Sequence, residues 1–148
     1  IVGCNSRLDA IQAAILNIKL QHLDEYIAAR RNAAAFYDKA FANHPKISVP
    51  YVEIKYSKHV YHQYTLILEG VDRDALVKYL AVKGIPSMIY YPVPGHKQNV
   101  FATMGGGDYH LEKTDWLTER VISLPIHTEL DEEQLSYITA EVLNFINQ

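Results

Sequence analysis

The chain has 148 residues, with 14 lysines and arginines against 17 aspartates and glutamates, and a formal net charge of −3. About half of the residues are apolar, which is typical of one globular domain, and the charge gives no basic footprint for nucleic acid. No apolar stretch approaches the roughly 20 residues that cross a bilayer, so no membrane partner is expected. The single cysteine, Cys4, cannot form an internal disulfide, which fits a reducing cytoplasm.

The first part of the chain has a helical pattern. A stripe of large apolar residues at three- and four-residue spacing predicts a helix over residues 8–23. The stripe consists of Leu8, Ile11, Ile15 and Ile18. A second helical pattern covers residues 24–42. Because neither glycine nor proline separates the two, they could also form one long, bent helix.

Strand and helix patterns alternate in the middle of the chain. Residues 59–68 alternate with the period of a strand, which predicts a central strand. Asp72 opens a helix that stops at Gly84, a residue suited to the left-handed position after a helix. Residues 85–91 then indicate a second strand, which ends at a turn over residues 92–95.

In the last third of the chain, the pattern predicts a short helix at 97–104. A second helix, a strand and a final helix follow it. Thr114 is the expected cap of the second helix, residues 123–126 form the strand, and Asp131 with Gln134 opens the last helix as a capping box. This order of elements predicts an α/β fold with a small sheet and helices packed mainly on one face. No linker divides it.

Two stretches combine side chains that could form a site, and each has a simpler structural explanation. Residues 3–9 place an amide, a hydroxyl and a guanidinium at a helix start, where free N–H groups favour anions, although ordinary capping accounts for them too. Residues 90–96 carry two phenols and an imidazole on a turn at a strand end. Such loops often hold sites, but aromatic residues there also close cores.

A third stretch, residues 59–64, contains two histidines. Strand alternation places His62 and Tyr64 on one face and Tyr61 and Gln63 on the other. Histidines three apart on a strand do not readily chelate one metal, so structural roles are favoured. The usual short motifs for phosphate binding, paired-histidine metal binding and a serine nucleophile are missing from the sequence.

Four segments occur in an order that resembles the signature of a known family. They are Gly3-Cys4-Asn5-Ser6-Arg7-Leu8-Asp9 with Gln12-Ala13-Ala14, then His59-Val60-Tyr61-His62-Gln63-Tyr64, Tyr91-Pro92-Val93-Pro94-Gly95-His96 and Ser123-Leu124-Pro125. Together they resemble the DegT/DnrJ/EryC1/StrS family of pyridoxal-phosphate-dependent sugar aminotransferases, over essentially the whole chain. Within the family, the chain most resembles the enzymes that aminate a UDP-2-acetamido-2-deoxy-3-oxo-hexuronate for surface polysaccharide.

The resemblance implies the aspartate-aminotransferase fold, of which residues 1–148 match the small C-terminal domain and the long helix that precedes it. The large domain, which holds pyridoxal phosphate and the Schiff-base lysine, is expected upstream. None of the lysines here, including Lys19 and Lys97, is therefore expected to be catalytic. The chain alone is expected to be inactive and to bind no cofactor.

The resemblance also implies roles for five residues. Asn5 matches the asparagine that reaches the cofactor phosphate of the partner subunit in a homodimer. Arg7 matches a residue near the acidic part of the sugar nucleotide. Tyr90 and Tyr91 match a pair that lines the sugar pocket, although close relatives often have histidine at the position of Tyr90. His96 matches a histidine with either a substrate-binding or a scaffolding role.

The implied reaction moves an amino group from an amino acid, usually glutamate, to a nucleotide-linked ketosugar. Two alternatives stay open. The chain could be a free-standing α/β binding or assembly module of the same fold, or it could belong to a sugar dehydratase in which the lysine is replaced. The upstream sequence decides among them. The identity of the ketosugar and of the amino donor also lies outside what these residues determine.

Overall fold

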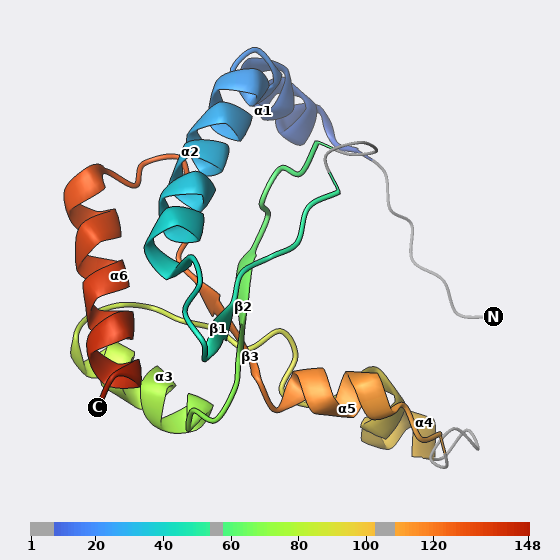
Figure 1. The fold of residues 1–148 in the computed structure, drawn as a ribbon. Coiled ribbons are helices and arrows are strands. Elements are labelled where there is room, and N and C mark those ends of the chain that lie inside the picture. The colour runs from blue at the N-terminus through green and yellow to red at the C-terminus, as the bar shows by residue number, and fades with distance from the viewer. Residues whose placement is uncertain (1–7, 54–57, 103–108) are drawn as a thin grey trace.

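The structure is a computed structural model that describes residues 8–53, 58–102 and 109–148. Two helices open it, α1 (Ala10–Leu20) and α2 (Leu23–Phe41). They are separated at Gln21 and His22, so they are two helices rather than one long, bent helix. In Figure 1, α1 lies at the end of α2 farthest from the sheet. The apolar stripe of α1 is therefore exposed, and no residue of α1 is buried.

The sheet has three antiparallel strands in the order β1 (Ile47–Ser48), β2 (Tyr64–Leu68) and β3 (Val121–Leu124). Ile47 pairs with Leu68, and Thr65 pairs with Ser123. Antiparallel pairing lets a sheet pack one face on a core while the other face stays partly open. The strand β2 follows this rule, because its residues alternate between buried and half-buried.

Both strands predicted before β3 are shorter than expected. The strand predicted over 59–68 begins only at Tyr64, because Tyr61 has a positive φ of 48° and the carbonyls of residues 59, 61 and 62 accept hydrogen bonds from Arg30 and Arg31. The strand predicted over 85–91 is reduced to a bridge between Met88 and Ser123. Prolines near both ends remove N–H donors that a strand needs.

Three helices cover one face of the sheet: α2, α3 (Arg73–Val82) and α6 (Glu132–Ile146). Figure 1 shows these helices gathered on the same side of the strands. The apolar residues between them and the sheet form the core. Its largest fully buried members are Tyr37, Phe41, Tyr64, Leu66, Leu68, Leu76, Leu80, Ile122 and Val142. This arrangement confirms the predicted α/β fold.

The helix ends predicted for α3 and α6 are confirmed. The carboxylate of Asp72 accepts a hydrogen bond from the backbone N–H of Ala75, and Gly84 has the left-handed φ of 74° that ends α3. At α6, Asp131 accepts from the backbone N–H of Gln134 at 2.8 Å, while the Gln134 side chain accepts from the backbone N–H of Asp131 at 3.1 Å. These bonds satisfy donors that a helix leaves unpaired.

A second group of helical segments, which we call the arm, projects away from the sheet in Figure 1. It consists of the 3₁₀ helix η1 (Gly95–Lys97), α4 (Asn99–Ala102) and α5 (Glu112–Thr118). The expected cap at Thr114 is wrong, because Thr114 lies inside α5, which begins after Leu111. Nowhere in the described ranges is a helix both long enough and apolar enough to cross a membrane.

Candidate functional site

Tyr90 and Tyr91 lie between the Met88 bridge and the arm. Their side chains are 40% and 70% exposed, and their rings meet edge to face with centroids 5.8 Å apart. The peptide bond between them is cis. No hydrogen bond joins either phenol to another residue that the structure describes. The two hydroxyls are thus free to bond to a ligand.

The phenol-bearing segment borders a cavity of about 270 Å³ at the end of strands β2 and β3. Its lining residues come from three segments of the chain and are His62, Gln63, Pro86, Met88, Tyr90, Ser123, Leu124, Pro125, Ile126 and His127. Among these described residues there is no lysine, arginine or carboxylate. An amide, hydroxyls and imidazoles beside apolar walls suit a neutral, hydroxyl-bearing ligand better than an anion.

The sequence interpretation of residues 59–64 needs a correction. Tyr61 does not face away from Tyr64: it packs against the core beside Tyr64, with ring centroids 6.2 Å apart. His62 instead lines the cavity together with Gln63. The reason is the left-handed backbone at Tyr61, which ends the strand alternation before it reaches these residues. The two polar side chains that were expected on opposite faces therefore meet.

The buried tyrosines are structural. The Tyr64 hydroxyl donates to Asp38 at 2.6 Å, and the Tyr37 hydroxyl donates to the carbonyl of Pro125 at 2.9 Å. Burial raises the pKa of both phenols far above the ordinary value, and for Tyr64 the hydrogen bond to Asp38 adds to this effect. Both stay protonated donors.

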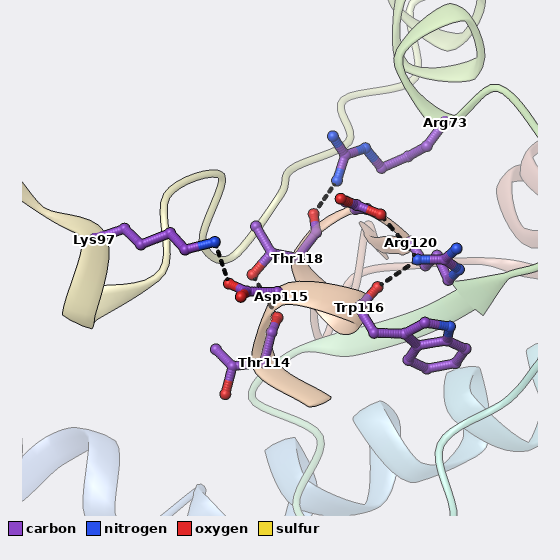
Figure 2. A network of polar contacts seen from close by, with 8 residues as sticks. Arg73, Lys97, Thr114, Asp115, Trp116, Thr118 and Arg120 are labelled. Carbon is purple, nitrogen blue, oxygen red and sulfur yellow. Dashed lines mark hydrogen bonds and ion pairs between the residues drawn. The ribbon is translucent and has the colours of Figure 1, made fainter. Parts of the chain in front are cut away.

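His96 packs inside the arm. Its side chain is only 8% exposed, and its Nε2 atom lies 3.5 Å from Oδ1 of Asp115 on α5. The neighbouring Lys97 places its Nζ atom 2.8 Å from the same oxygen, as Figure 2 shows. The hydrogen bond from Lys97 is the main cause that lowers the pKa of Asp115. Of the two roles expected for His96, this geometry favours the scaffolding one.

Asn5 and Arg7, the residues expected at the cofactor phosphate and the acidic part of the substrate, lie outside the described residues. Two features of the described residues do not suit pyridoxal phosphate. The start of α1 is capped by the carboxylate of Asp9, which repels a phosphate. Lys83 pairs with Glu141, mainly through a hydrogen bond that raises its pKa, whereas a Schiff-base lysine needs a lowered one.

Metal chemistry finds no support in the described part of the chain either. No group of three or more histidines, cysteines, aspartates or glutamates there is placed to hold a metal ion. His127 and Asp115 were not singled out from the sequence. The nearby Ser123-Leu124-Pro125 motif could have pointed to His127, but nothing local to Asp115 reveals its partners, since they lie 18 or more positions earlier in the chain.

The small sheet, the helices over one of its faces and the cavity beside Tyr90 define a small α/β domain. The family model of the DegT/DnrJ/EryC1/StrS aminotransferases matches residues 1–143. The chain belongs to this family.

Three relatives and one solved structure illustrate the match. The chain is 38% identical to a pleiotropic regulatory protein of Geobacillus stearothermophilus over 98% of its length and 39% of the relative. It is 40% identical to a UDP-N-acetyl-3-dehydro-alpha-D-glucosamine 3-aminotransferase of Acidithiobacillus ferrooxidans, over 96% of the chain and 37% of that protein. It is 36% identical to the UDP-2-acetamido-2-deoxy-3-oxo-D-glucuronate aminotransferase of Pseudomonas aeruginosa, over 97% of the chain and 38% of that protein.

The crystal structure of DesV from Streptomyces venezuelae superimposes with a TM-score of 0.87 at 33% identity. It covers 99% of this chain, which in turn covers 38% of DesV. The fold is thus that of part of a sugar aminotransferase. The chain spans less than half the length of the relatives that it matches.

Proposed function

We propose that this chain is the C-terminal small domain, with the helix before it, of a longer pyridoxal-phosphate-dependent aminotransferase that aminates a nucleotide-linked ketosugar. One observation carries the proposal. The family match runs along residues 1–143, and the relatives named for their reaction are nucleotide-sugar aminotransferases. That the chain covers only 37–39% of these relatives supports a further domain in the intact enzyme.

In this proposal, Tyr90 and Tyr91 bind the sugar. Their phenols are exposed, and Tyr90 borders a cavity without lysine, arginine or carboxylate among its described lining residues. A hexose carries several hydroxyls that can donate hydrogen bonds to such groups and accept them. The phosphates of the nucleotide need a cation instead, and Arg7 supplies it according to the family resemblance.

Asn5 provides the link to the cofactor. By resemblance its amide reaches the phosphate of pyridoxal phosphate bound in the partner subunit, so that the intact enzyme is a homodimer. The cofactor, when bound, carries the amino group between the two substrates. The Schiff-base lysine then belongs to the upstream domain, and the 148-residue chain alone has no activity. We place the enzyme in the cytoplasm, in keeping with the single cysteine of this chain.

The proposed substrate is a UDP-2-acetamido-2-deoxy-3-oxo-hexuronate, and the proposed donor is glutamate. The resemblance to the P. aeruginosa relative supports this choice at 36% identity. Arg7 fits it as well, because a hexuronate adds a carboxylate to the charges of the nucleotide.

The test is an assay of the full-length protein with this ketosugar nucleotide and glutamate. We expect an aminated sugar nucleotide and one 2-oxoglutarate for each amino group transferred. Loss of water from the sugar without amino transfer would instead identify a dehydratase. A full-length protein that retains no pyridoxal phosphate after purification would point to a binding or assembly module.

A further inference from the structure

The segment that bears Tyr90 and Tyr91 is held at both of its ends. At the upstream end, Met88 and Ser123 exchange two backbone hydrogen bonds, at 3.1 Å and 2.7 Å. At the downstream end, His96 and Lys97 both approach the Asp115 carboxylate. The two tyrosines lie between these two sets of contacts, and their own side chains take part in neither set. The position of the tyrosines therefore depends on the Met88–Ser123 pairing and on the contacts with Asp115.

Little slack separates the tyrosines from the downstream anchor. Pro92 and Pro94 fix the φ angles of two of the four residues between Tyr91 and His96. The turn closes with a hydrogen bond from the backbone N–H of Lys97 to the carbonyl of Pro94 at 2.9 Å. A displacement of His96 thus reaches Tyr91 through a stiff connection.

Both anchors lie on one continuous stretch of chain, because β3 follows α5 directly. Arg73 of α3 donates a hydrogen bond to the carbonyl of Thr118, which fastens the end of α5 to the body of the domain (Figure 2). Arg120 donates to the carbonyl of Trp116 at 2.9 Å and lies over the Trp116 ring. These contacts fix α5, and with it Asp115, relative to α3 and the sheet.

The downstream contacts are partly shielded from water. Asp115 has 29% of its side chain exposed, and the imidazole of His96 only 8%. Nε2 of His96 is buried and makes no hydrogen bond within the described residues, and Oδ1 of Asp115 lies 3.5 Å from it. A shielded carboxylate that meets two basic side chains from one turn holds that turn more firmly than an exposed ion pair does.

We propose that Asp115 is a positioning residue for sugar binding: through His96 and Lys97 it fixes the turn that follows Tyr91 and Tyr90, the latter of which lines the cavity. It acts without touching the substrate. The inference deepens the proposed function and rests on it for the identity of the ligand. The ligand whose binding depends on Asp115 is the ketosugar of the sugar nucleotide, not the amino donor.

The test compares Asp115→Asn with Glu119→Gln in the full-length protein. Glu119 is a matched control, since it is the C-cap residue of the same helix and its side chain pairs, among the described residues, with the adjacent Arg120. We expect Asp115→Asn to raise the KM for the ketosugar nucleotide about threefold to fivefold. The kcat value and the KM for glutamate should stay at wild-type values, as should all three parameters of Glu119→Gln.

A second variant guards against damage to α5. Lys97→Met removes a partner from η1 and leaves α5 unchanged, and we expect the same rise in KM. The double variant should show a smaller effect than the sum of the two single ones, because both substitutions break one contact. A fall in kcat at unchanged KM in either single variant would overturn the positioning role.

Amide hydrogen exchange over residues 88–98 separates this inference from the proposed function. We expect faster exchange there in Asp115→Asn, above all at the hydrogen-bonded amides of Lys97 and Gln98, and none of this change in Glu119→Gln. Unchanged exchange in Asp115→Asn would show that Asp115 does not hold the turn. Faster exchange with an unchanged KM would show that the turn does not matter for sugar binding. If the wild-type enzyme transfers no amino group, the proposed function fails, yet exchange still decides whether Asp115 holds the tyrosines.

Discussion

At the scale of single residues, two pairs of tyrosines differ in their surroundings. Tyr37 and Tyr64 are buried, have hydrogen-bond acceptors within the domain and stabilise the fold. Tyr90 and Tyr91 are exposed and have no such acceptor among the described residues. In the proposed function this second pair binds the sugar, because a phenol that is exposed to water can exchange its bond to water for one to a ligand.

Tyr90→Phe tests this division. Removal of one neutral hydrogen bond corresponds to about 0.5–1.5 kcal/mol, so we expect the KM for the ketosugar nucleotide in the full-length enzyme to rise about twofold to tenfold. The unfolding midpoint of the chain should not change. Tyr51→Phe is the control, because the Tyr51 hydroxyl bonds to Glu53 and not to the cavity. An equal rise in both variants would argue against a specific role for Tyr90.

Glu141 offers a test based on pH. Its pKa is lowered below the ordinary value of 4.5, first by the hydrogen bond from Tyr79 and then by its pairing with Lys83. A lowered pKa in the folded state means that the ionised carboxylate stabilises the fold above about pH 4.5. This contribution is lost as the pH falls through the lowered, folded-state pKa.

Thermal unfolding of the chain between pH 7 and pH 3 measures the effect. We expect Glu141→Gln to unfold at a lower temperature than the wild type at pH 7, with the difference shrinking as the pH falls below 4.5. The exposed Glu69→Gln serves as control and should follow the wild type. A constant difference across the whole pH range would show that Glu141 acts through packing and not through its charge.

At the scale of elements, the least supported helix is α1. It is apolar on several sides, yet none of its residues is buried, and Ile11, Ile18 and Leu20 are each more than 60% exposed. A helix of 11 residues gains little stability from its backbone alone and usually needs a surface to pack on. The proposed upstream domain or the partner subunit would provide that surface.

This exposure predicts that the 148-residue chain self-associates. We expect sedimentation to show growing assemblies over micromolar concentrations, and Ile11→Glu with Ile18→Glu to shift the chain towards the monomer without change in the core. Val82→Glu is the control, because Val82 is 86% exposed but lies at the end of α3, away from α1. A wild-type chain that stays monomeric over this range would contradict the prediction.

At the scale of the whole molecule, local rules predicted several of the elements, whereas contacts between distant residues set the remaining bounds and the site. Capping at Asp72 and Asp131 and the alternation in Tyr64–Leu68 depend on neighbours in sequence, so they could be predicted. The late start of β2, at Tyr64 instead of residue 59, depends on hydrogen bonds from Arg30 and Arg31 of α2, which no local pattern reveals.

The site shows the same limit. Tyr90, Tyr91 and His96 were predicted from their resemblance to a family motif. In the structure the rings of the two tyrosines are in contact, whereas His96 is buried in the arm beside Asp115. The meeting of His62 and Gln63 at one cavity and the role of Asp115 needed the fold. The predicted roles of Asn5 and Arg7 lie outside the described residues and stay predictions.

The central claim is that this chain is one part of an aminotransferase whose cofactor site needs another domain. The most direct measurement adds pyridoxal phosphate to the purified 148-residue chain and to the full-length protein, followed by borohydride reduction and absorbance. We expect stoichiometric, covalently trapped cofactor in the full-length protein only. Stoichiometric trapping at a single lysine of the 148-residue chain would contradict the account and place the active site within these residues.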